Sequence, residues 1–326
     1  KRVIICLSLF LCAVPTWATK RYVSPTGSDA AVGASWGTAW QNTSKVNSST
    51  IGGDTIFFAP GEYHGRLVPV SGTANARTYY ICGNGVDNTW MKDRSAKLYG
   101  GSRVTTWTLY SGSIWRASWD GTLGTPLASD GTEPEQAVGI VNYSGGRDTL
   151  LIPRTTVGGV TVGCSYYDGV GKLLYVWLPN SADPNSYHME ASSSPVVVFY
   201  GGISYTTIYG LSLQFGKRAV VYFGSSLPAK NFNTVEYCTL FGASWYAGNN
   251  CSLWLSENPG IGSGYFDSSM INGTGNKIRA CSLGVAFDGS QAAHGVCSYS
   301  QWHMEIDSNY VWGVGDGIFL KVNSSY

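Results

Sequence analysis

The sequence predicts an all-β protein built as a parallel β-helix, and three observations carry this prediction. Of the 326 residues, 42 are glycine and only 13% are charged, a composition that favours short strands joined by tight turns. The phrase "NTVEYCTLFG", which begins at Asn233, recurs as "NKIRACSLGV" from Asn276. No amphipathic helix pattern accompanies this repeat, so a helical solenoid is excluded and stacked coils of strands remain.

The first 18 residues, "KRVIICLSLFLCAVPTWA", are basic, then apolar, and end with the small residues Thr16 and Ala18. This order predicts a secretory signal peptide over residues 1–18. Its apolar run of about twelve residues is too short to span a bilayer, so we expect a secreted chain with no membrane span after cleavage. Loss of Lys1 and Arg2 would change the net charge from +1 to −1, which argues against a nucleic-acid partner.

Residues 19–102 are predicted to form an N-terminal cap and the first coils. A strand is followed by a glycine- and serine-rich loop, by a short segment with Trp40 and Val46, and by a second strand at Thr55–Ala59. A solenoid needs a cap because its first coil would otherwise expose its core.

Residues 103–195 break the repeat. The stretches "VTTWTLYSGSIWRASW" and "KLLYVWLPNSADPNSYHMEAS" alternate between polar and apolar residues, are rich in aromatic residues and contain turn signals. They predict an antiparallel β region inserted between early coils.

Residues 196–326 are predicted to form further coils. Ile208, Val235, Ile278 and Ile306 occupy equivalent positions at separations of 27, 43 and 28 residues, and we assign the extra length to a loop at Ser256–Met270. Equivalent residues of stacked coils lie about 4.8 Å apart, so these four residues predict an inward apolar ladder.

Two more columns follow from the same register. The first is a second apolar ladder, formed by Leu213, Leu240, Leu283 and Val311. The second is a turn-side column of Leu211, Cys238, Cys281 and Asn309. Its two cysteines should be neighbours, either as a ladder of small buried side chains or as a disulfide, which parallel-strand geometry would strain.

With "YVSPTGSDA…GTAW…GGDTIFFAPGEY" and "RTYYICGNG", the chain resembles secreted bacterial right-handed parallel β-helix proteins of the pectate-lyase-like superfamily. The resemblance covers nearly all of the chain after residue 18, and it implies a right-handed helix of the carbohydrate-active type. Such helices usually have further coils, whereas this chain stops in mid-coil at "GIFLKVNSSY". We therefore expect the chain to be truncated at its C-terminus.

The same register places Tyr209, Glu236, Arg279 and Asp307 in one outward column. We predict catalytic roles for Glu236, Arg279 and Asp307, with Tyr209 binding the substrate. The two carboxylates would lie two rungs, about 9.6 Å, apart, which permits an inverting glycosidase and disfavours a retaining one. The alternative is a salt-bridge ladder on a solvated sheet face.

Three further residues, His303, Asp316 and Lys321, are predicted to bind substrate. A lyase would need a base and a cation, roles open to Arg279 and Lys321. No cofactor or metal site is predicted, although Asp307 and Asp316 could hold Ca²⁺ if the protein were a lyase. His64 and His188 receive no role.

The favoured function is that of a secreted, monomeric enzyme that degrades an extracellular polysaccharide along the face of the β-helix. Both a glycoside hydrolase and a polysaccharide lyase fit. The alternative is a non-catalytic β-helix that binds glycans as a surface or adhesion protein.

Overall fold

The computed structural model describes residues 18–121, 137–144, 147–199, 202–217, 219–223, 229–244, 250–255, 273–284, 293–299, 301–312 and 316–321. The signal peptide predicted for residues 1–18, except Ala18, and the loop predicted at Ser256–Met270 lie outside the described residues.

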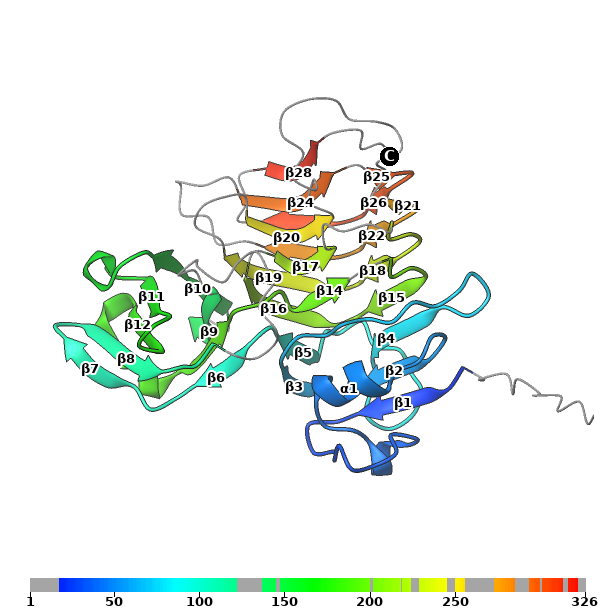
Figure 1. Cartoon of the computed structure of the whole chain (residues 1–326), viewed down its shortest axis with the longest axis horizontal. Coiled ribbons are helices and arrows are strands. Elements are labelled where there is room, and N and C mark those ends of the chain that lie inside the picture. Colours follow the sequence, from blue (N-terminus) through cyan, green and yellow to red (C-terminus); the bar gives the residue numbers. More distant parts are fainter. Residues whose placement is uncertain are drawn as a thin grey trace, which may run out of the picture.

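The described chain is a parallel β-helix with three faces (Figure 1). The first sheet contains β1 (Lys20–Val23), β2 (Thr55–Phe58), β4 (Thr78–Cys82), β15 (Thr206–Tyr209), β18 (Thr234–Glu236), β22 (Lys277–Arg279) and β26 (Glu305–Asp307). The second sheet contains β3 (Gly61–His64), β5 (Ala96–Tyr99), β16 (Ser212–Lys217), β19 (Thr239–Ser244), β23 (Ser282–Gly284) and β27 (Tyr310–Trp312). The third sheet contains β14 (Val197–Phe199), β17 (Ala219–Phe223), β20 (Asn250–Leu255), β24 (Ala293–Tyr299) and β28 (Asp316–Lys321).

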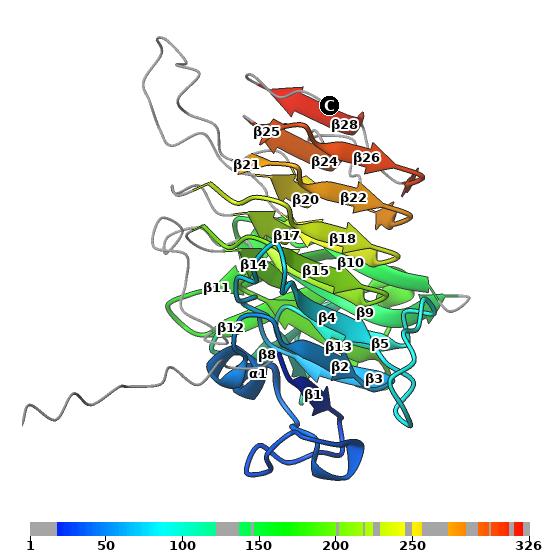
Figure 2. The same ribbon diagram turned by 90° about the vertical axis from the view of Figure 1, so that its right-hand side faces the viewer.

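From β4 onward each coil contributes to the three sheets in turn, whereas, within the described residues, β1 and the β2–β3 coil have no strand in the third sheet. Neighbouring coils pair in parallel, as β15, β16 and β17 do with β18, β19 and β20. A further small pair joins β21 (Gly273–Thr274) to β25 (Gln301–Trp302). Figure 2 shows the coils stacked from the N-terminal end upward.

Both apolar ladders predicted from the sequence are confirmed. The first is in register through Ile208, Val235, Ile278 and Ile306, and the second through Leu213, Leu240, Leu283 and Val311. The 43-residue step is a single coil, because β18 pairs directly with β22. The first ladder continues downward through Tyr80 and Ile56, which sequence reasoning did not connect to it.

Buried asparagines tie the coils together. The Oδ1 atom of Asn233 accepts from the backbone N–H of Thr206, and its Nδ2 donates to the carbonyl of Ile203. One coil later, Asn276 accepts from the N–H of Asn233 and donates to the carbonyl of Lys230. Both side chains are 1% exposed, so each buried amide is satisfied by the backbone of the coil before it.

The predicted turn-side column is confirmed as well. Cys238 and Cys281 are buried, unpaired thiols, so the small-residue ladder holds and the disulfide alternative is wrong. The Sγ atom of Cys281 lies 3.5 Å from the carbonyl oxygen of Val235. Asn309 takes the equivalent place one coil later and donates from Nδ2 to the carbonyl of Ile278 at 2.8 Å.

The N-terminal end of the stack is capped. Trp40 and Val46, of which Val46 lies on the short helix α1 (Thr43–Ser49), are almost completely buried and join the main core. A 3-10 turn, η1 (Trp36–Thr38), precedes them. The cap therefore covers the apolar ladder where no further coil follows.

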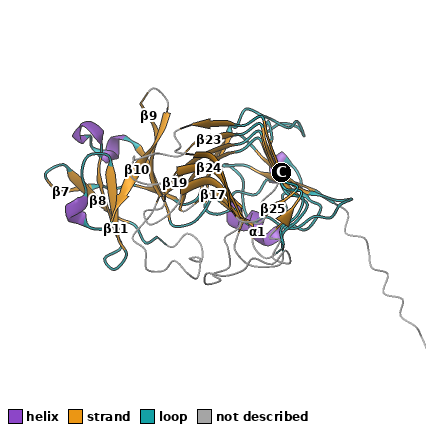
Figure 3. Ribbon diagram, turned by 90° about the horizontal axis from the view of Figure 1, so that it is seen from above, coloured by secondary structure: helices purple, strands orange, loops and turns teal. Residues whose placement is uncertain are grey.

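The inserted region lies between β5 and β14, at the corner between the second and third sheets (Figure 3). It forms an eight-stranded sheet of β6 (Ser102–Val104), β13 (His188–Ser192), β9 (Ala137–Ser144), β10 (Arg147–Arg154), β11 (Cys164–Asp168), β12 (Leu173–Trp177), β8 (Ile114–Ser118) and β7 (Thr108–Ser111). Three 3-10 turns join these strands: η2 (Val157–Gly159), η3 (Pro179–Ser181) and η4 (Pro184–Ser186).

The described strand pairs of the insertion are antiparallel, as predicted, except that β10 and β11 are parallel. The connection between them, which contains η2, brings the chain back by only two residues, so that β11 begins with Cys164 opposite Ile152 of β10. The sheet folds over on itself at this pair, since strands from both of its halves contribute to one apolar core.

One half of the inserted sheet packs against the second sheet of the β-helix. Ala137, Val141 and Leu150 of the insertion form a small core with aromatic residues of the second sheet, among them Phe215. The close approach needs a glycine at position 139, because a Cβ atom there would lie 2.1 Å from the Phe215 ring. Apolar packing thus holds the insertion against the β-helix. Polar residues lie at the edge of the insertion that is next to β3.

Candidate active site at the junction of the β-helix and the insertion

Strand β3 presents Glu62 and His64 on the outward face of the second sheet. Side chains alternate along a strand, so the intervening Tyr63 points into the β-helix, where it is 2% exposed. The Tyr63 hydroxyl donates to the carbonyl of Ala59 at 2.8 Å and lies 3.1 Å from that of Val23, which fixes β3 against the cap.

Strand β13 of the insertion brings a matching pair, His188 and Glu190, to the same place. Between them, Met189 points into the core of the insertion and is completely buried. Arg103 of β6 is the cross-strand neighbour of Glu190 and is exposed. Two strands that are far apart in the sequence therefore each contribute one histidine and one glutamate.

These four side chains form a continuous chain of contacts, which we call the histidine–carboxylate cluster. Its order is Glu62, His188, Glu190, His64. The Oε1 atom of Glu62 lies 3.7 Å from Nδ1 of His188. Nε2 of His188 lies 2.5 Å from Oε1 of Glu190, and because an ionised carboxylate can only accept, that nitrogen is the donor. Oε2 of Glu190 lies 3.4 Å from Nδ1 of His64.

The cluster has a buried and an open part. The side chains of Glu190 and His188 are 1% and 16% exposed, whereas those of His64 and Glu62 are 37% and 40% exposed. Nδ1 of His64 and Oε2 of Glu190 face each other without a hydrogen bond within the described residues. Buried polar atoms in that state are rare and often belong to reactive groups.

Tyr99 of β5 forms the floor of the cluster. It is completely buried, stacks on His64 with ring centroids 5.5 Å apart, and meets His188 edge to face at 5.8 Å. Its hydroxyl donates to Oε1 of Glu62 at 3.5 Å. Burial, followed by the charges of Glu62 and Glu190, raises the pKa of Tyr99, so the phenol keeps its proton.

The pKa of His64 is raised above its ordinary value of 6.5. Burial alone would lower it, but the contact with Glu190 and the charge of Glu62 outweigh both burial and the opposing charge of Arg103. A partly exposed imidazole with a carboxylate behind it is an arrangement that can accept and return a proton.

The outward column of the first sheet has the register predicted from the sequence: Tyr209, Glu236, Arg279 and Asp307 are consecutive partners. Nη2 of Arg279 lies 2.9 Å from Oε1 of Glu236, a hydrogen-bonded ion pair that raises the pKa of Arg279. Its other contact, at 3.9 Å, is with Glu305.

The alternative of a salt-bridge ladder thus describes the contacts of this column, with one correction: Glu305, and not Asp307, is the second acidic partner of Arg279. Asp307 accepts instead from the hydroxyl of Ser308 at 3.0 Å. Tyr209 is 8% exposed, because Trp90 and Tyr237 meet its ring edge to face at 5.1 and 5.3 Å.

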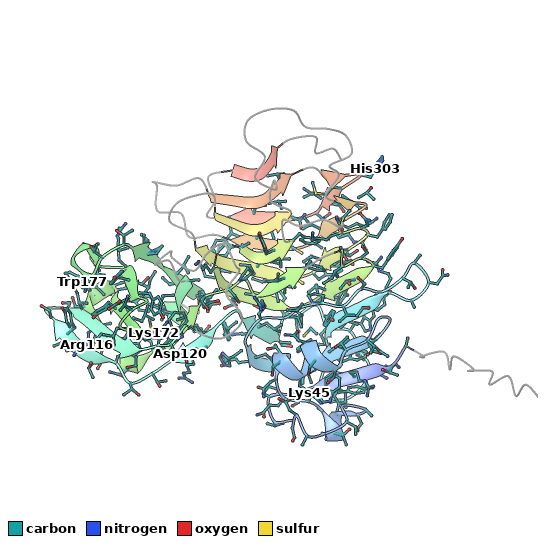
Figure 4. The ribbon with its side chains drawn as sticks, viewed as in Figure 1. Lys45, Arg116, Asp120, Lys172, Trp177 and His303 are labelled. Atoms are coloured by element: carbon teal, nitrogen blue, oxygen red, sulfur yellow. The ribbon has the colours of Figure 1, made fainter. Side chains whose placement is uncertain are left out.

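The remaining residues predicted from the sequence lie elsewhere. His303 is exposed just after β25, on the side of the β-helix away from the insertion (Figure 4). Asp316 and Lys321 begin and end β28, and their side chains lie outside the described residues. The structure does not bring these three residues to the histidine–carboxylate cluster.

Sequence reasoning missed the whole cluster. One signal was present: Glu62–Tyr63–His64 and His188–Met189–Glu190 each place an imidazole and a carboxylate two residues apart. On a strand that spacing puts both groups on one face.

Within the described residues, no group of three or more His, Cys, Asp or Glu side chains is arranged to hold a metal ion. We therefore derive no step through Ca²⁺, and its use remains a prediction. None of the helices in the described ranges has the length and apolar character needed to cross a membrane.

Comparison with known proteins shows likeness in fold. A complex of XylC with xylose superposes with a TM-score of 0.53 at 12% identity, covering 93% of this chain and 64% of that one. A glycoside hydrolase superposes with a TM-score of 0.50 at 11% identity, covering 91% of this chain and 80% of that one. The pectate lyase Pel9A is matched at a TM-score of 0.43 and 11% identity, over 95% of this chain and 56% of that one.

The chain spans about two thirds of the length of the xylose-bound protein, 64%. No protein-family model matches the chain, and no curated protein matches its sequence. The predicted resemblance to β-helix proteins is confirmed at the level of the fold, and at these identities the likeness is one of fold alone.

Proposed function

We propose that the protein is a secreted, monomeric lyase that cleaves an acidic extracellular polysaccharide by β-elimination, with the histidine–carboxylate cluster as its acid–base centre. The observation that carries this proposal is the buried carboxylate of Glu190 between the imidazoles of His188 and His64, of which His64 reaches solvent. The likeness in fold to a protein bound to xylose and to a glycoside hydrolase supports a carbohydrate substrate, whose acidic character follows from the proposed elimination.

In the proposed reaction, neutral His64 takes the proton from the sugar carbon that bears the carboxylate. The electron pair of that C–H bond becomes a carbon–carbon double bond, and the neighbouring bond to the glycosidic oxygen breaks. The imidazolium of His64 then returns the proton to the departing oxygen, so the enzyme ends in its starting state and no water is consumed. Arg103, close enough to oppose the protonation of His64, would stabilise the charge that develops on the substrate carboxylate.

Hydrolysis fits this geometry less well. Glycosidases place two carboxyl groups on either side of the scissile bond. Here the imidazole of His188 lies between Glu62 and Glu190, and Glu190 is almost completely buried. Elimination requires only one accessible base and one cation, which His64 and Arg103 supply.

The buried members act on His64 without touching the substrate. Glu190 holds the imidazole of His64 from behind, His188 holds Glu190, and Tyr99 supports the rings of both histidines. These are positioning residues, whereas His64 is the catalytic base.

The experiment is digestion of a panel of acidic and neutral polysaccharides, with the ultraviolet absorbance of the new double bond and the reducing ends both recorded. We expect absorbance to rise with an acidic polymer and to fall roughly 10²–10⁴-fold in His64→Gln, assayed well below the melting temperature of that variant. The matched control is His303→Gln, at an exposed histidine on the far side of the β-helix.

Reducing ends without absorbance would show hydrolysis and overturn the proposed reaction. Binding without any product would make the chain a glycan-binding β-helix. Equal losses in the two histidine variants would remove the special role of His64.

A further inference from the structure

The half of the inserted sheet that lies away from the β-helix carries aromatic and arginine side chains on its outer face. This half contains β11, β12, β8 and β7 (Figure 1). The inner face of the same strands, with Tyr167 and Val176, belongs to the core of the insertion. Their neighbours in the sequence, Tyr166 and Tyr175, therefore point outward.

Strand pairing aligns these side chains in one row. Arg154 is the partner of Tyr166, Tyr166 of Tyr175, and Tyr175 of Arg116. Paired residues of neighbouring strands point to the same side, so the row reads Arg, Tyr, Tyr, Arg across four strands. We call it, together with Tyr110 of β7, the arginine–tyrosine strip.

The strip is packed but accessible. Tyr175 forms its base at 7% exposure, flanked by Tyr110 edge to face at 5.2 Å and by Tyr166 stacked at 5.9 Å. Tyr110 is 45% exposed, and the guanidinium carbon of Arg116 lies 5.2 Å from the centre of its ring. Arg116 is exposed and Arg154 half-buried. Arg116 lies on the side of the insertion away from the β-helix (Figure 4).

Within the described part of the chain, the two arginines of the strip have no carboxylate partner. Among the described residues, neither Arg116 nor Arg154 is in an ion pair. Asp168 shares the outer face of β11, but its Oδ1 atom accepts from the backbone N–H groups of Val170 and Gly171. Two arginines that flank tyrosine rings are therefore available to an anionic partner.

We infer that the arginine–tyrosine strip is a second glycan-binding site, which holds an oligosaccharide bearing carboxylates. A guanidinium binds a carboxylate through two parallel hydrogen bonds, and a tyrosine ring offers an apolar face with a polar rim. The two arginines are three strand spacings, about 14 Å, apart, so the strip takes several sugar units rather than one. This site requires no chemistry and does not depend on the elimination reaction.

Calorimetric binding tests this inference. The probes are oligomers of galacturonate, mannuronate and glucuronate, together with the same oligomers after methyl esterification, which removes the charge and keeps the sugar. All measurements use the full chain carrying His64→Gln, so that the probe is not consumed. We expect at least one acidic oligomer to bind, its esterified form to bind at least tenfold more weakly, and 0.5 M salt to weaken binding.

On that background, Arg116→Gln and Arg154→Gln should each weaken binding about tenfold, because each removes a charge-assisted contact. Tyr110→Ala should weaken it as well. The matched control is Lys20→Gln, which removes one exposed positive charge in the N-terminal cap and should leave binding unchanged. Melting temperatures should stay constant, since the substituted side chains reach solvent.

Several outcomes would overturn the inference: no binding by any acidic oligomer, equal binding of the esterified form, or unchanged binding in both arginine variants. A dimer in solution that Arg116→Gln abolishes would assign the strip to a second copy of the chain instead. Failure to find an unsaturated product would overturn the proposed reaction and leave this inference standing.

Discussion

The outward column of the first sheet and the histidine–carboxylate cluster both bring carboxylates to basic side chains, but they differ in burial and in pairing. In the column, Arg279 is 42% exposed and pairs with Glu236 at one side of its guanidinium. In the cluster, one carboxylate that is 1% exposed serves two imidazoles. The two regions contain similar residue types. What distinguishes the candidate site is a carboxylate that is buried from solvent and shared by two partners.

The physical reason is the cost of taking charge out of water. Exposed ion pairs contribute about 0–1 kcal/mol because solvent already stabilises both groups. A buried carboxylate is stabilised by its partners instead of by solvent. Removing one member of the pair therefore lowers the free energy of unfolding by several kcal/mol.

The largest effect on stability should come from Glu190→Gln. The amide keeps the shape but removes the charge that His188 and His64 face, and we expect a loss of about 3 kcal/mol in the free energy of unfolding. Urea denaturation measures it. Glu305→Gln, which changes a carboxylate that is 39% exposed, is the control and should cost less than about 1 kcal/mol. Equal losses of unfolding free energy in the two variants would contradict the expected difference between a buried and an exposed carboxylate.

A smaller effect should appear in the pH dependence. Because the proposed base is neutral His64, activity should rise with pH through a pKa above 6.5. The charge of Glu62 helps to raise that pKa, so in Glu62→Gln the rising limb of the pH profile should move to lower pH. A profile that stays in place or moves upward would contradict this role of Glu62.

The same shift has the opposite effect on stability. A histidine whose pKa is higher in the folded than in the unfolded state stabilises the fold while it is protonated. That contribution is complete below about 6.5, the unfolded value, and is lost as the pH rises through the folded pKa. Melting temperature measured against pH should therefore fall where activity rises, and less so in Glu62→Gln.

The smallest effect should come from the outward column. Glu236→Gln breaks a pair whose arginine is 42% exposed, and Asp307→Asn removes a contact with a serine hydroxyl, so each should change stability by about 1 kcal/mol or less. Polysaccharide cleavage should be unchanged in both variants. A fall of a hundredfold or more would move the chemistry back to the column that the sequence predicts.

Much of the β-helix could be predicted because its contacts repeat. Ile208, Val235 and Ile278 each pair with their counterparts one coil away, so a period in the sequence is also a contact in space. The prediction missed Ile56 and Tyr80, since the insertion separates Tyr80 from its next partner, Ile208.

The cluster could not be predicted in the same way. His64 and Glu190 are joined by no period, and they meet only because the insertion packs β13 beside the second sheet. That packing depends on how side chains fit together, for example the Phe215 ring against Gly139. Such a fit cannot be predicted from the composition of the sequence. The alternation of side chains along a strand predicts that each histidine lies on the same face as the glutamate two residues away. It does not predict that these faces of β3 and β13 contact each other.

The buried asparagines have a consequence for how such a protein can evolve. Asn233 and Asn276 each bind the backbone of the preceding coil, and the register between their strands is the same after 27 residues as after 43. The number of residues that connect two strands of a coil can therefore vary, whereas the spacing between neighbouring coils cannot. A gene segment that runs from one such asparagine to the next encodes a unit whose upper and lower surfaces already match. Its duplication would lengthen the protein by one coil, and its corner could acquire new residues without disturbing the coils on either side.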